Sequence, residues 1–226
     1  MHDPFHAEEF AEMALSLHEV ESFQDTVDRV LEVAVKALNC NYAGVIVIHE
    51  RSRAETVAAT HPVVADLDAI QIECGEGPDL EVIADRHGVL VPDATRDERW
   101  PTWAQRVAET GVRSMLGTRL YTSTTVIGSL NFYDTEPDKF GAEDVDVAHL
   151  LARHAAVAME RARDTEHLWK AIDARNLIGQ AQGLLMERFG VEADQAFAVL
   201  RRYSQDQNIK LHLVAQRLIE TRALPE

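Results

Sequence analysis

The last sixty residues carry side chains of the types that contact polyanions. Four cations stand with four amide or hydroxyl groups: Arg188, Arg201, Arg202 and Lys210, and Gln182, Ser204, Gln207 and Asn208. Cationic groups bind phosphates, and amides and hydroxyls can hydrogen-bond to unpaired bases. The same charges suit a solvated helix surface, where Arg202 would pair with Asp206 four residues later. Residue types alone leave both interpretations open.

Histidine and cysteine spacing does not predict a metal site. The chain has ten histidines but no His-Glu-x-x-His motif and no Cys/His cluster. His149 and His154 are five residues apart, so they share a helix face poorly, and His2 and His6 lie close to the terminus. We expect no metal, although a single axial histidine to a haem stays open.

Common enzyme motifs are missing as well. The sequence has no Gly-x-Ser-x-Gly, phosphate-binding loop or dinucleotide fingerprint. A phosphoacceptor receiver needs acidic residues directly after its first strand, but His49-Glu50-Arg51 follows Ile48. Cys74 could be an exposed nucleophile or redox switch, yet a lone cysteine is more often a small buried hydrophobe. We expect no enzyme.

The net charge of −16 comes from the first part of the chain. Residues 1–165 hold 14 basic and 30 acidic side chains, whereas residues 166–226 hold eight of each. An acidic body repels nucleic acid and anionic membranes, so a polyanion would bind the last sixty residues. Only two cysteines occur, and no apolar run approaches the ~20 residues of a membrane helix. We expect a cytoplasmic protein without membrane contact.

Hydrophobic periodicity predicts a mixed α+β part over residues 1–141. Helices are expected at 5–17, 22–38, 63–72, 79–85 and 100–111, and strands at 42–48, 56–60, 89–91, 114–121 and 126–133. Ser22 is the expected N-cap of the second helix, and Asn39 ends it. A Thr/Ser turn joins the last two strands, which predicts an antiparallel hairpin.

A long linking helix is predicted at about 142–172, because no glycine or proline occurs between Ala142 and Gly179. An apolar stripe at three- and four-residue spacing runs along it. The stripe residues expected in a coiled-coil dimer seam are Leu151, Ala155, Ala158, Ala162, Trp169 and Ile172. The helix could instead pack on its own domain. We expect both, with the first half intramolecular or mixed and the second half in a parallel homodimer.

Three short amphipathic helices are predicted for the last segment. Gly190 is the expected C-cap of the first helix, and Asn208 is the expected N-cap of the third. Short connections between such helices should bring Arg188, Arg201 and Lys210 close together on a compact three-helix unit.

Three blocks of residues 178–215 resemble an ANTAR domain. They are Ile178-Gly-Gln-Ala-Gln-Gly-Leu-Leu-Met-Glu-Arg-Phe-Gly-Val191, Gln195-Ala-Phe-Ala-Val-Leu-Arg-Arg-Tyr-Ser-Gln-Asp206, and Asn208-Ile-Lys-Leu211 with Val214-Ala215. The resemblance implies a three-helix module that binds RNA hairpins, promotes transcription antitermination and often works as a dimer. It favours the RNA interpretation of the eight polar residues. Gln182 departs from the family, which usually has Lys or Arg there.

Residues 20–165 resemble a GAF domain in five blocks: Gly75-Glu-Gly-Pro78, Asp97-Glu-Arg-Trp-Pro101, Gly111-Val-Arg-Ser-Met-Leu116, Val126-Ile-Gly-Ser-Leu-Asn-Phe132 and Phe140-Gly-Ala-Glu-Asp-Val145. The resemblance implies a sensor with a small-molecule cavity between the sheet and residues 63–91. We predict that Cys74, Leu116 and Leu130 line it. The lysine of cyclic-nucleotide-binding GAF domains is absent after Asn131, which does not favour a cyclic nucleotide.

Together the resemblances imply an α+β fold. A GAF-like antiparallel sheet flanked by helices would occupy residues 1–165, ending in the linking helix, and a three-helix ANTAR-like module would occupy 166–226. We predict a signal-responsive regulator that binds RNA hairpins in nascent transcripts and acts as an antiterminator, with a small-molecule ligand of unknown identity. Two alternatives stay open: a DNA-binding helix-turn-helix with its recognition helix at 210–219, and a protein-interaction module on a GAF scaffold that senses nothing.

Overall fold

The computed structural model describes residues 12, 14–17, 20, 22–49, 53–84 and 88–223. The chain forms two compact units, Met1–Arg163 and Asp164–Glu226, and each is described by itself. Most of the helix predicted at 5–17 lies outside the described residues. Within the described ranges, no helix combines the length and the apolar character needed to cross a membrane.

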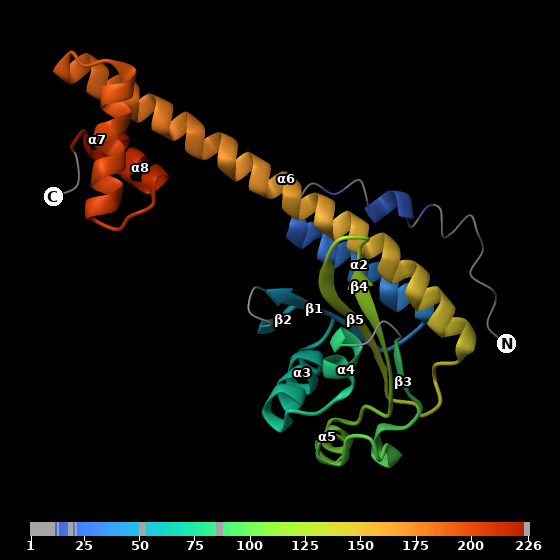
Figure 1. The fold of residues 1–226 in the computed structure, drawn as a ribbon. Helices are drawn as coiled ribbons and strands as arrows, with labels where there is room; N and C mark the ends of the chain where they lie inside the picture. Colours follow the sequence, from blue (N-terminus) through green and yellow to red (C-terminus); the bar gives the residue numbers. More distant parts are fainter. Residues whose placement is uncertain are drawn as a thin grey trace. The chain divides into compact units, whose positions relative to one another are not determined.

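A five-stranded antiparallel sheet forms the centre of the first unit (Figure 1). Its strands are β1 (Tyr42–His49), β2 (Arg53–Ala59), β3 (Val89–Val91), β4 (Ser114–Tyr121) and β5 (Val126–Asp134), in the spatial order β2-β1-β5-β4-β3. β4 and β5 form the predicted hairpin, and its turn is closed by a hydrogen bond from the Thr122 amide to the Thr125 carbonyl. The predicted antiparallel sheet flanked by helices is therefore confirmed.

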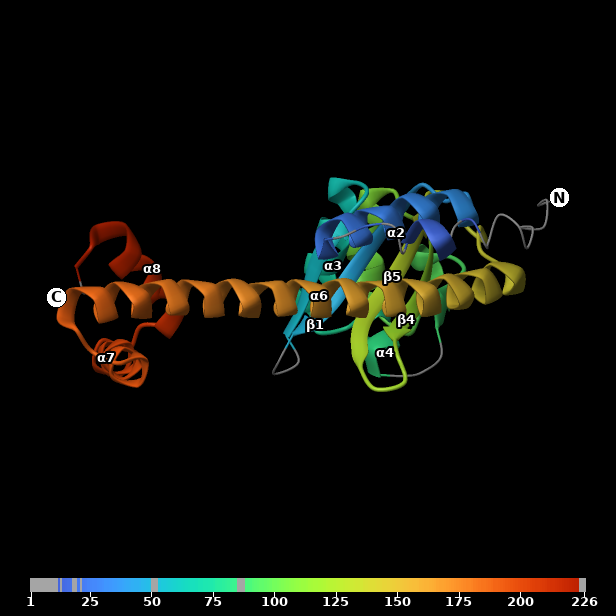
Figure 2. The same cartoon turned by 90° about the horizontal axis from the view of Figure 1, so that it is seen from above.

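Helices cover both faces of this sheet. α2 (Phe23–Leu38) and the first part of α6 (Ala142–Phe189) lie on one face, and α3 (Pro62–Cys74), α4 (Pro78–Ala84) and α5 (Pro101–Val107) lie on the other (Figures 1 and 2). Successive strand residues point to opposite faces. Leu116 and Leu130 therefore belong to the core under α2 and α6, whereas Met115 and Tyr133 belong to the core under α3, α4 and α5.

The helix α2 has both predicted ends. The Ser22 hydroxyl accepts a hydrogen bond from the Asp25 amide, and Asn39 ends the helix in the left-handed conformation with φ of 46°. An N-cap of this kind is worth about 1 kcal/mol. The apolar stripe of α2 is buried against β1 and β5, which places this helix between the sheet and solvent.

The helix α6 is longer than the linking helix that the sequence predicted. It runs without interruption for 48 residues through Gly179 and Gly183, so the linking helix and the first helix of the last segment are one element. A glycine costs a helix only about 1 kcal/mol, which the buried Ala181 and Leu185 beside these glycines outweigh.

The first half of the predicted dimer seam packs within its own chain, which is one of the two arrangements expected for it. Leu151, Ala155 and Ala158 are buried in the core under α2, and Ala162 is buried as well. These four side chains are covered by their own chain and cannot form an interface with a second one. Of the six predicted seam residues, Trp169 and Ile172 are exposed, by 61% and 39%.

The second unit is built on the end of α6, with α7 (Ala193–Asp206) and α8 (Leu211–Thr221) packed against it. Its core consists of small and aliphatic side chains from all three helices: Ala181, Leu185, Ala196, Leu200, Val214, Ala215 and Leu218. Gly190 ends α6 with φ of 63°, as predicted. Asn208 is not the N-cap of α8, because Lys210 takes that position and Asn208 lies in the preceding turn with φ of 53°.

Candidate nucleic-acid interface and sensor cavity

Two arginines meet at one end of the second unit. Arg188, near the end of α6, donates a hydrogen bond of 2.6 Å to the carbonyl oxygen of Arg222, which ends α8. Its guanidinium carbon lies 5.6 Å from the centre of the Phe189 ring. This contact holds a cation and an aromatic face side by side at the ends of two helices.

A groove of about 390 Å³ runs beside these residues. Its lining combines aliphatic side chains with charges: Leu184, Leu185, Glu187, Arg188, Phe189, Leu218, Arg222 and Ala223. The Phe189 side chain is 61% exposed. Unpaired RNA bases stack on aromatic rings and guanidinium planes, so this groove has the chemistry to hold a base. The sequence analysis singled out neither Phe189 nor Arg222, because the groove depends on a contact between residues 34 positions apart.

The cation Lys210 lies at the other end of α8. Lys210 precedes its first turn, and an 11-residue helix is about 16 Å long. Arg188 at the C-terminal end of α8 and Lys210 at its N-terminal end are therefore not close together, contrary to the prediction. Arg201 is exposed on α7, and Arg202 forms the predicted ion pair with Asp206 at 3.5 Å.

Two side chains that were predicted to contact RNA form hydrogen bonds within the domain. The Gln182 amide donates to the Ala193 carbonyl at 3.1 Å, which ties α6 to the start of α7. The Ser204 hydroxyl donates to the Ile209 carbonyl at 2.6 Å, which closes the turn between α7 and α8. Gln207 and Asn208 are exposed in this turn. RNA contacts by Gln182 and Ser204 would have to compete with these internal hydrogen bonds.

Apart from the exposed Arg217, the helix α8 presents few groups that could read DNA bases. His212 is half-buried, and Gln216 donates its amide to Glu220 at 2.9 Å. Val214, Ala215 and Leu218 face the core. This surface does not favour the helix-turn-helix alternative, in which exposed polar side chains of a recognition helix enter the major groove.

The residues predicted to line the sensor cavity lie elsewhere. Leu116 and Leu130 are buried on the opposite face of the sheet, under α2 and α6. Cys74 is the last residue of α3 and accepts a hydrogen bond from Arg106 at 3.7 Å. The cavity on the α3–α4 side is small, about 20 Å³, and presents a mainly apolar surface, formed by residues that were not predicted.

Five buried or half-buried polar side chains converge beside this cavity. Thr56 of β2 and Tyr133 of β5 both donate to Asp68, Tyr133 at 3.3 Å. Gln71 donates to Asp79, and its amide oxygen accepts from the Asp79 backbone N–H at 2.8 Å. The Tyr133 hydroxyl also lies 3.4 Å from Asp79. Two carboxyl groups from α3 and α4 therefore share one tyrosine.

The Gly75-Glu76-Gly77-Pro78 loop positions this cluster. The Glu76 carboxylate accepts from the backbone amides of Thr102 and Trp103, at 2.6 and 2.9 Å, and so caps α5. Gly77 has φ of 147°, and a Cβ there would come within 2.4 Å of the Gln71 amide oxygen. Only glycine leaves room for Gln71 to reach Asp79.

Burial changes the protonation of the cluster. Desolvation raises the pKa of Asp68 to about 6, against hydrogen bonds from Thr56, Asp79 and Tyr133 that lower it. Desolvation and the charge of Asp68 raise the pKa of Asp79 well above its ordinary range. Desolvation likewise raises the pKa of Tyr133, which keeps its hydroxyl proton. Burial therefore favours the protonated form of both carboxyl groups.

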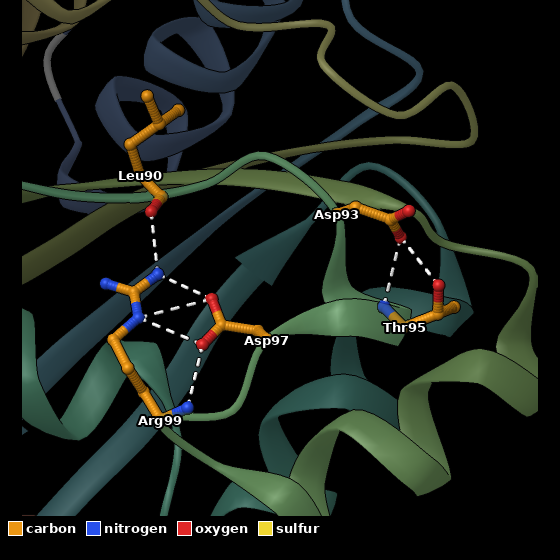
Figure 3. Close-up of polar contacts among 5 residues, drawn as sticks. All are labelled: Leu90, Asp93, Thr95, Asp97 and Arg99. Carbon is orange, nitrogen blue, oxygen red and sulfur yellow. Dashed lines mark hydrogen bonds and ion pairs between the residues drawn. The ribbon is translucent and has the colours of Figure 1, made fainter.

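The Asp97-Glu-Arg-Trp-Pro101 block is a structural loop. Figure 3 shows Arg99 bound to the Asp97 carboxylate and to the Leu90 carbonyl, at 2.6 and 2.8 Å for the closest contacts. These contacts tie the loop before α5 to strand β3. Nearby, Asp93 accepts from the amide and hydroxyl of Thr95 (Figure 3). Hydrogen bonds from Arg113 lower the pKa of Asp93 strongly.

The cysteines and histidines supply no assembled reactive centre in the part of the chain that the structure describes. Burial raises the pKa of Cys40 to about 12, which disfavours its reactive thiolate. A search of the described residues finds no group of three His, Cys, Asp or Glu side chains able to hold a metal ion.

Comparisons with known proteins agree with this architecture. Solved structures with a similar fold include GAF domains of the phosphoenolpyruvate-protein phosphotransferases from Acinetobacter and Coxiella burnetii. The Acinetobacter domain is 15% identical, with a TM-score of 0.56 and coverage of 72% of this chain and 97% of that one. The Coxiella domain is 16% identical, with a TM-score of 0.56 and coverage of 70% and 94%.

A third similar structure is the free methionine-R-sulfoxide reductase from Neisseria meningitidis in complex with its substrate. It is 13% identical, with a TM-score of 0.51 and coverage of 68% of this chain and 87% of that one. At these identities the likeness shows the fold alone. A comparison with curated proteins finds no match.

Family models cover both units. The GAF domain model matches residues 20–160, which is more than half of the chain, and the ANTAR domain model matches residues 166–219. The two matches follow one another in the order that the sequence blocks predicted. The chain thus belongs to the GAF domain family and carries an ANTAR domain after the GAF domain, which makes it a GAF–ANTAR protein.

Proposed function

We propose that this protein is a signal-responsive regulator whose ANTAR domain binds RNA hairpins and thereby promotes transcription antitermination. The observation that carries the proposal is the ANTAR match at residues 166–219, which coincides with the three-helix unit bearing the exposed cations. The GAF domain then supplies the sensor. The protein acts by binding rather than by catalysis, and its place of action is the cytoplasm, where nascent transcripts are made.

The surface chemistry of the ANTAR domain supports RNA as the partner. Arg201 and Lys210 are exposed and suited to phosphate contacts along a stem. The groove beside Phe189 and Arg188 lies about one α8 length away and suits an unpaired loop base. A hairpin offers a stem and a loop at such a separation, whereas a uniform duplex offers no unpaired base.

The exposed face of α6 supports a homodimer. Leu168, Trp169 and Ile172 are exposed large hydrophobic side chains on neighbouring turns. Burying such a stripe against a second copy is the usual solution for a long helix. We propose a parallel dimer through these three residues, which places two ANTAR domains on one transcript and raises the effective concentration of the second.

The test is a gel-shift titration of the full chain against single RNA hairpins, tandem hairpins and DNA duplexes of matching sequence, over a salt series. We expect tandem hairpins to bind more tightly than single ones. Phe189→Ala should weaken hairpin binding by about 1–3 kcal/mol, the value of one stacked base. The matched control is Phe197→Ala, which removes a partly exposed phenylalanine from α7.

A transcription assay across a hairpin-controlled terminator then tests antitermination. Tight DNA binding without RNA binding would favour the helix-turn-helix alternative, and the absence of any nucleic-acid binding would favour an interaction module.

The dimer is tested separately by light scattering. Trp169→Glu with Ile172→Glu should give monomers and abolish the advantage of tandem hairpins. Lys170→Glu, which adds a glutamate on the opposite side of the helix, should leave the dimer intact.

A further inference from the structure

The outward side of the first half of α6 carries two large apolar side chains that its own domain does not cover. Leu150 is 47% exposed and Val157 is 51% exposed, whereas the residues that follow them, Leu151 and Ala158, are buried in the core. Figure 2 looks down onto the side of this helix that faces away from the sheet. Single exposed apolar residues are common on protein surfaces, but an aligned set of large ones marks an interaction site.

These two residues lie on one line with exposed apolar residues of the proposed dimer seam. At about 100° per residue, a spacing of seven leaves Leu150 and Val157 about 20° apart around the helix axis. Leu168 follows Leu150 by about five full turns, and Ile172 lies about one turn beyond it. The helix is unbroken over this whole stretch. Leu150, Val157, Leu168 and Ile172 therefore form one straight apolar stripe, which we call the outer stripe.

Polar side chains at the edge of the outer stripe are held by their own domain. The Arg153 guanidinium donates to the Tyr121 hydroxyl at 2.8 Å and lies 4.7 Å from the centre of that ring. The Glu160 carboxylate accepts from the Thr122 hydroxyl at 3.3 Å. Both partners belong to the β4–β5 hairpin. The stripe thus has an apolar centre and a polar edge, which is the usual composition of a protein–protein interface.

The size of the proposed seam indicates what covers the rest of the stripe. Leu168, Trp169 and Ile172 can bury only about 400 Å² per copy, because each is already partly covered by its own chain. A stable interface buries at least about 600 Å² per partner. Leu150 and Val157 continue the same side of the helix, so a second copy seated on the seam would find the missing apolar area there.

We propose that the dimer interface extends onto the GAF domain, where Leu150 and Val157 pack against the same residues of a second copy. The orientation is parallel, as in the proposed seam, so each residue of the stripe meets its own counterpart. The inference rests on the proposed dimer and adds the GAF domain as a second contact surface.

Sedimentation of the full chain over a range of concentrations tests the extended interface. Leu150→Glu with Val157→Glu should raise the dimer dissociation constant at least about a hundredfold, because four apolar contacts per dimer are replaced by charges. The matched control is Ala65→Glu with Ala69→Glu, which adds the same charges at exposed positions of α3, on the other face of the sheet. The control should change the dissociation constant by no more than about twofold.

Crosslinking tests the orientation and needs no charged variant. Leu150→Cys and Val157→Cys, each introduced alone, should form a disulfide-linked dimer under mild oxidation, since cysteines whose β-carbons lie about 4 Å apart can be bridged. The unaltered chain, with Cys40 buried and Cys74 at the end of α3, should stay unlinked. In an antiparallel pair Leu150 would face the other end of the stripe, so Leu150→Cys would crosslink only in combination with Ile172→Cys.

Several results would overturn the inference. If Leu150→Glu with Val157→Glu kept the dimer while Trp169→Glu with Ile172→Glu broke it, the GAF domain would take no part in the interface. An equal loss of dimer in the α3 control would mean general charge repulsion, and the antiparallel crosslink would reject the parallel contact. A monomeric unaltered chain would reject the seam together with its extension. Binding of a single hairpin is measured independently, so RNA binding by the ANTAR domain is judged by its own titration.

Discussion

Arginines serve different purposes in the two domains. In the GAF domain Arg113 binds Asp93, Arg99 binds Asp97 and Arg106 binds Glu73, each with a contact of 2.6–2.7 Å. In the ANTAR domain Arg188 donates only to a backbone carbonyl, and Arg202 has a looser ion pair at 3.5 Å. The GAF domain thus uses these cations to fix its own loops, whereas Arg201 of the ANTAR domain is exposed on α7.

The hydrophobic cores of the two domains also differ in size. The GAF domain has a core on each face of its sheet and encloses a polar cluster in one of them. The ANTAR domain has a single small core of seven side chains. A domain with so few buried contacts has little stability to spare, so its folding should be far more sensitive to a single core change. Four predictions test this contrast, from the largest effect to the smallest.

The first prediction concerns independence of the two cores. Leu200→Asp places a charge among the buried side chains of α7 and should cost at least about 4 kcal/mol. The ANTAR domain should unfold while the thermal transition of the GAF domain remains, as seen by calorimetry and hydrogen exchange. Val199→Asp, at the partly exposed neighbouring position, should keep both transitions. Loss of the GAF transition in Leu200→Asp would show that the domains fold as one.

The second prediction uses the opposite pKa shifts within the GAF domain. Asp68 has its pKa raised from 3.8 to about 6, so its contribution to stability is present at low pH and is lost as pH rises through 6. The shift corresponds to about 3 kcal/mol. Asp93, with a lowered pKa, contributes stability above its ordinary pKa and loses it on acidification.

Urea unfolding at a series of pH values measures this effect. Between pH 4 and pH 7.5, Asp68→Asn should gain about 3 kcal/mol relative to the unaltered protein, because asparagine cannot ionise. Asp66→Asn is the control and should show no such trend. If the difference in unfolding free energy between Asp68→Asn and the unaltered protein stayed constant across this pH range, the pKa of Asp68 would not be raised by folding.

The third prediction asks whether the two sets of arginines differ in RNA binding. Arg201→Ala should weaken hairpin affinity about tenfold at physiological salt and reduce the salt slope by about one. Arg106→Ala removes a partly exposed cation from the GAF domain, where it binds Glu73 at 2.7 Å, and should change neither quantity. Equal losses from both variants would indicate a nonspecific charge effect and would remove Arg201 from the interface.

Much of this architecture could be predicted from sequence because local signals agreed with the fold. Ser22 and Asn39 mark both ends of α2, and the Thr/Ser turn marks the β4–β5 hairpin. The cavity could not be predicted in the same way. β4 and β5 are buried on both faces of the sheet. Their sequences therefore lack the alternation of apolar and polar residues that would show which face each side chain occupies. Leu116 and Leu130 were therefore assigned to the wrong face.

Polar residues of the cavity carried a weaker signal. Asp68, Gln71 and Asp79 stand on helices that also have exposed acidic residues, such as Asp66, so nothing in their spacing marks them as buried. Gln71 bonds directly to Asp79, and the contact of both aspartates with Tyr133, more than fifty residues away, brings them together. Tertiary packing also explains the error in α6. Its glycines suggested that the helix would break, but the helix continues through them.

The last prediction concerns Arg202, an ANTAR arginine with an acidic partner. The pair between Arg202 and Asp206 is exposed, and a helix pair four residues apart is worth about 0.3–0.5 kcal/mol. Asp206→Asn should therefore lower the stability of the domain by no more than this amount. If Arg202 contacts RNA phosphate, the same change removes a competing carboxylate and should raise hairpin affinity about twofold.

This gain should disappear when Arg202→Ala is added, and a double-mutant cycle on hairpin affinity measures that coupling. An equal gain from Asp206→Asn with and without Arg202 would mean that the aspartate acts only by repelling phosphate. Arg202 would then behave like the arginines of the GAF domain, as a residue that serves its own helix, and the contrast between the two domains would rest on Arg188 and Arg201.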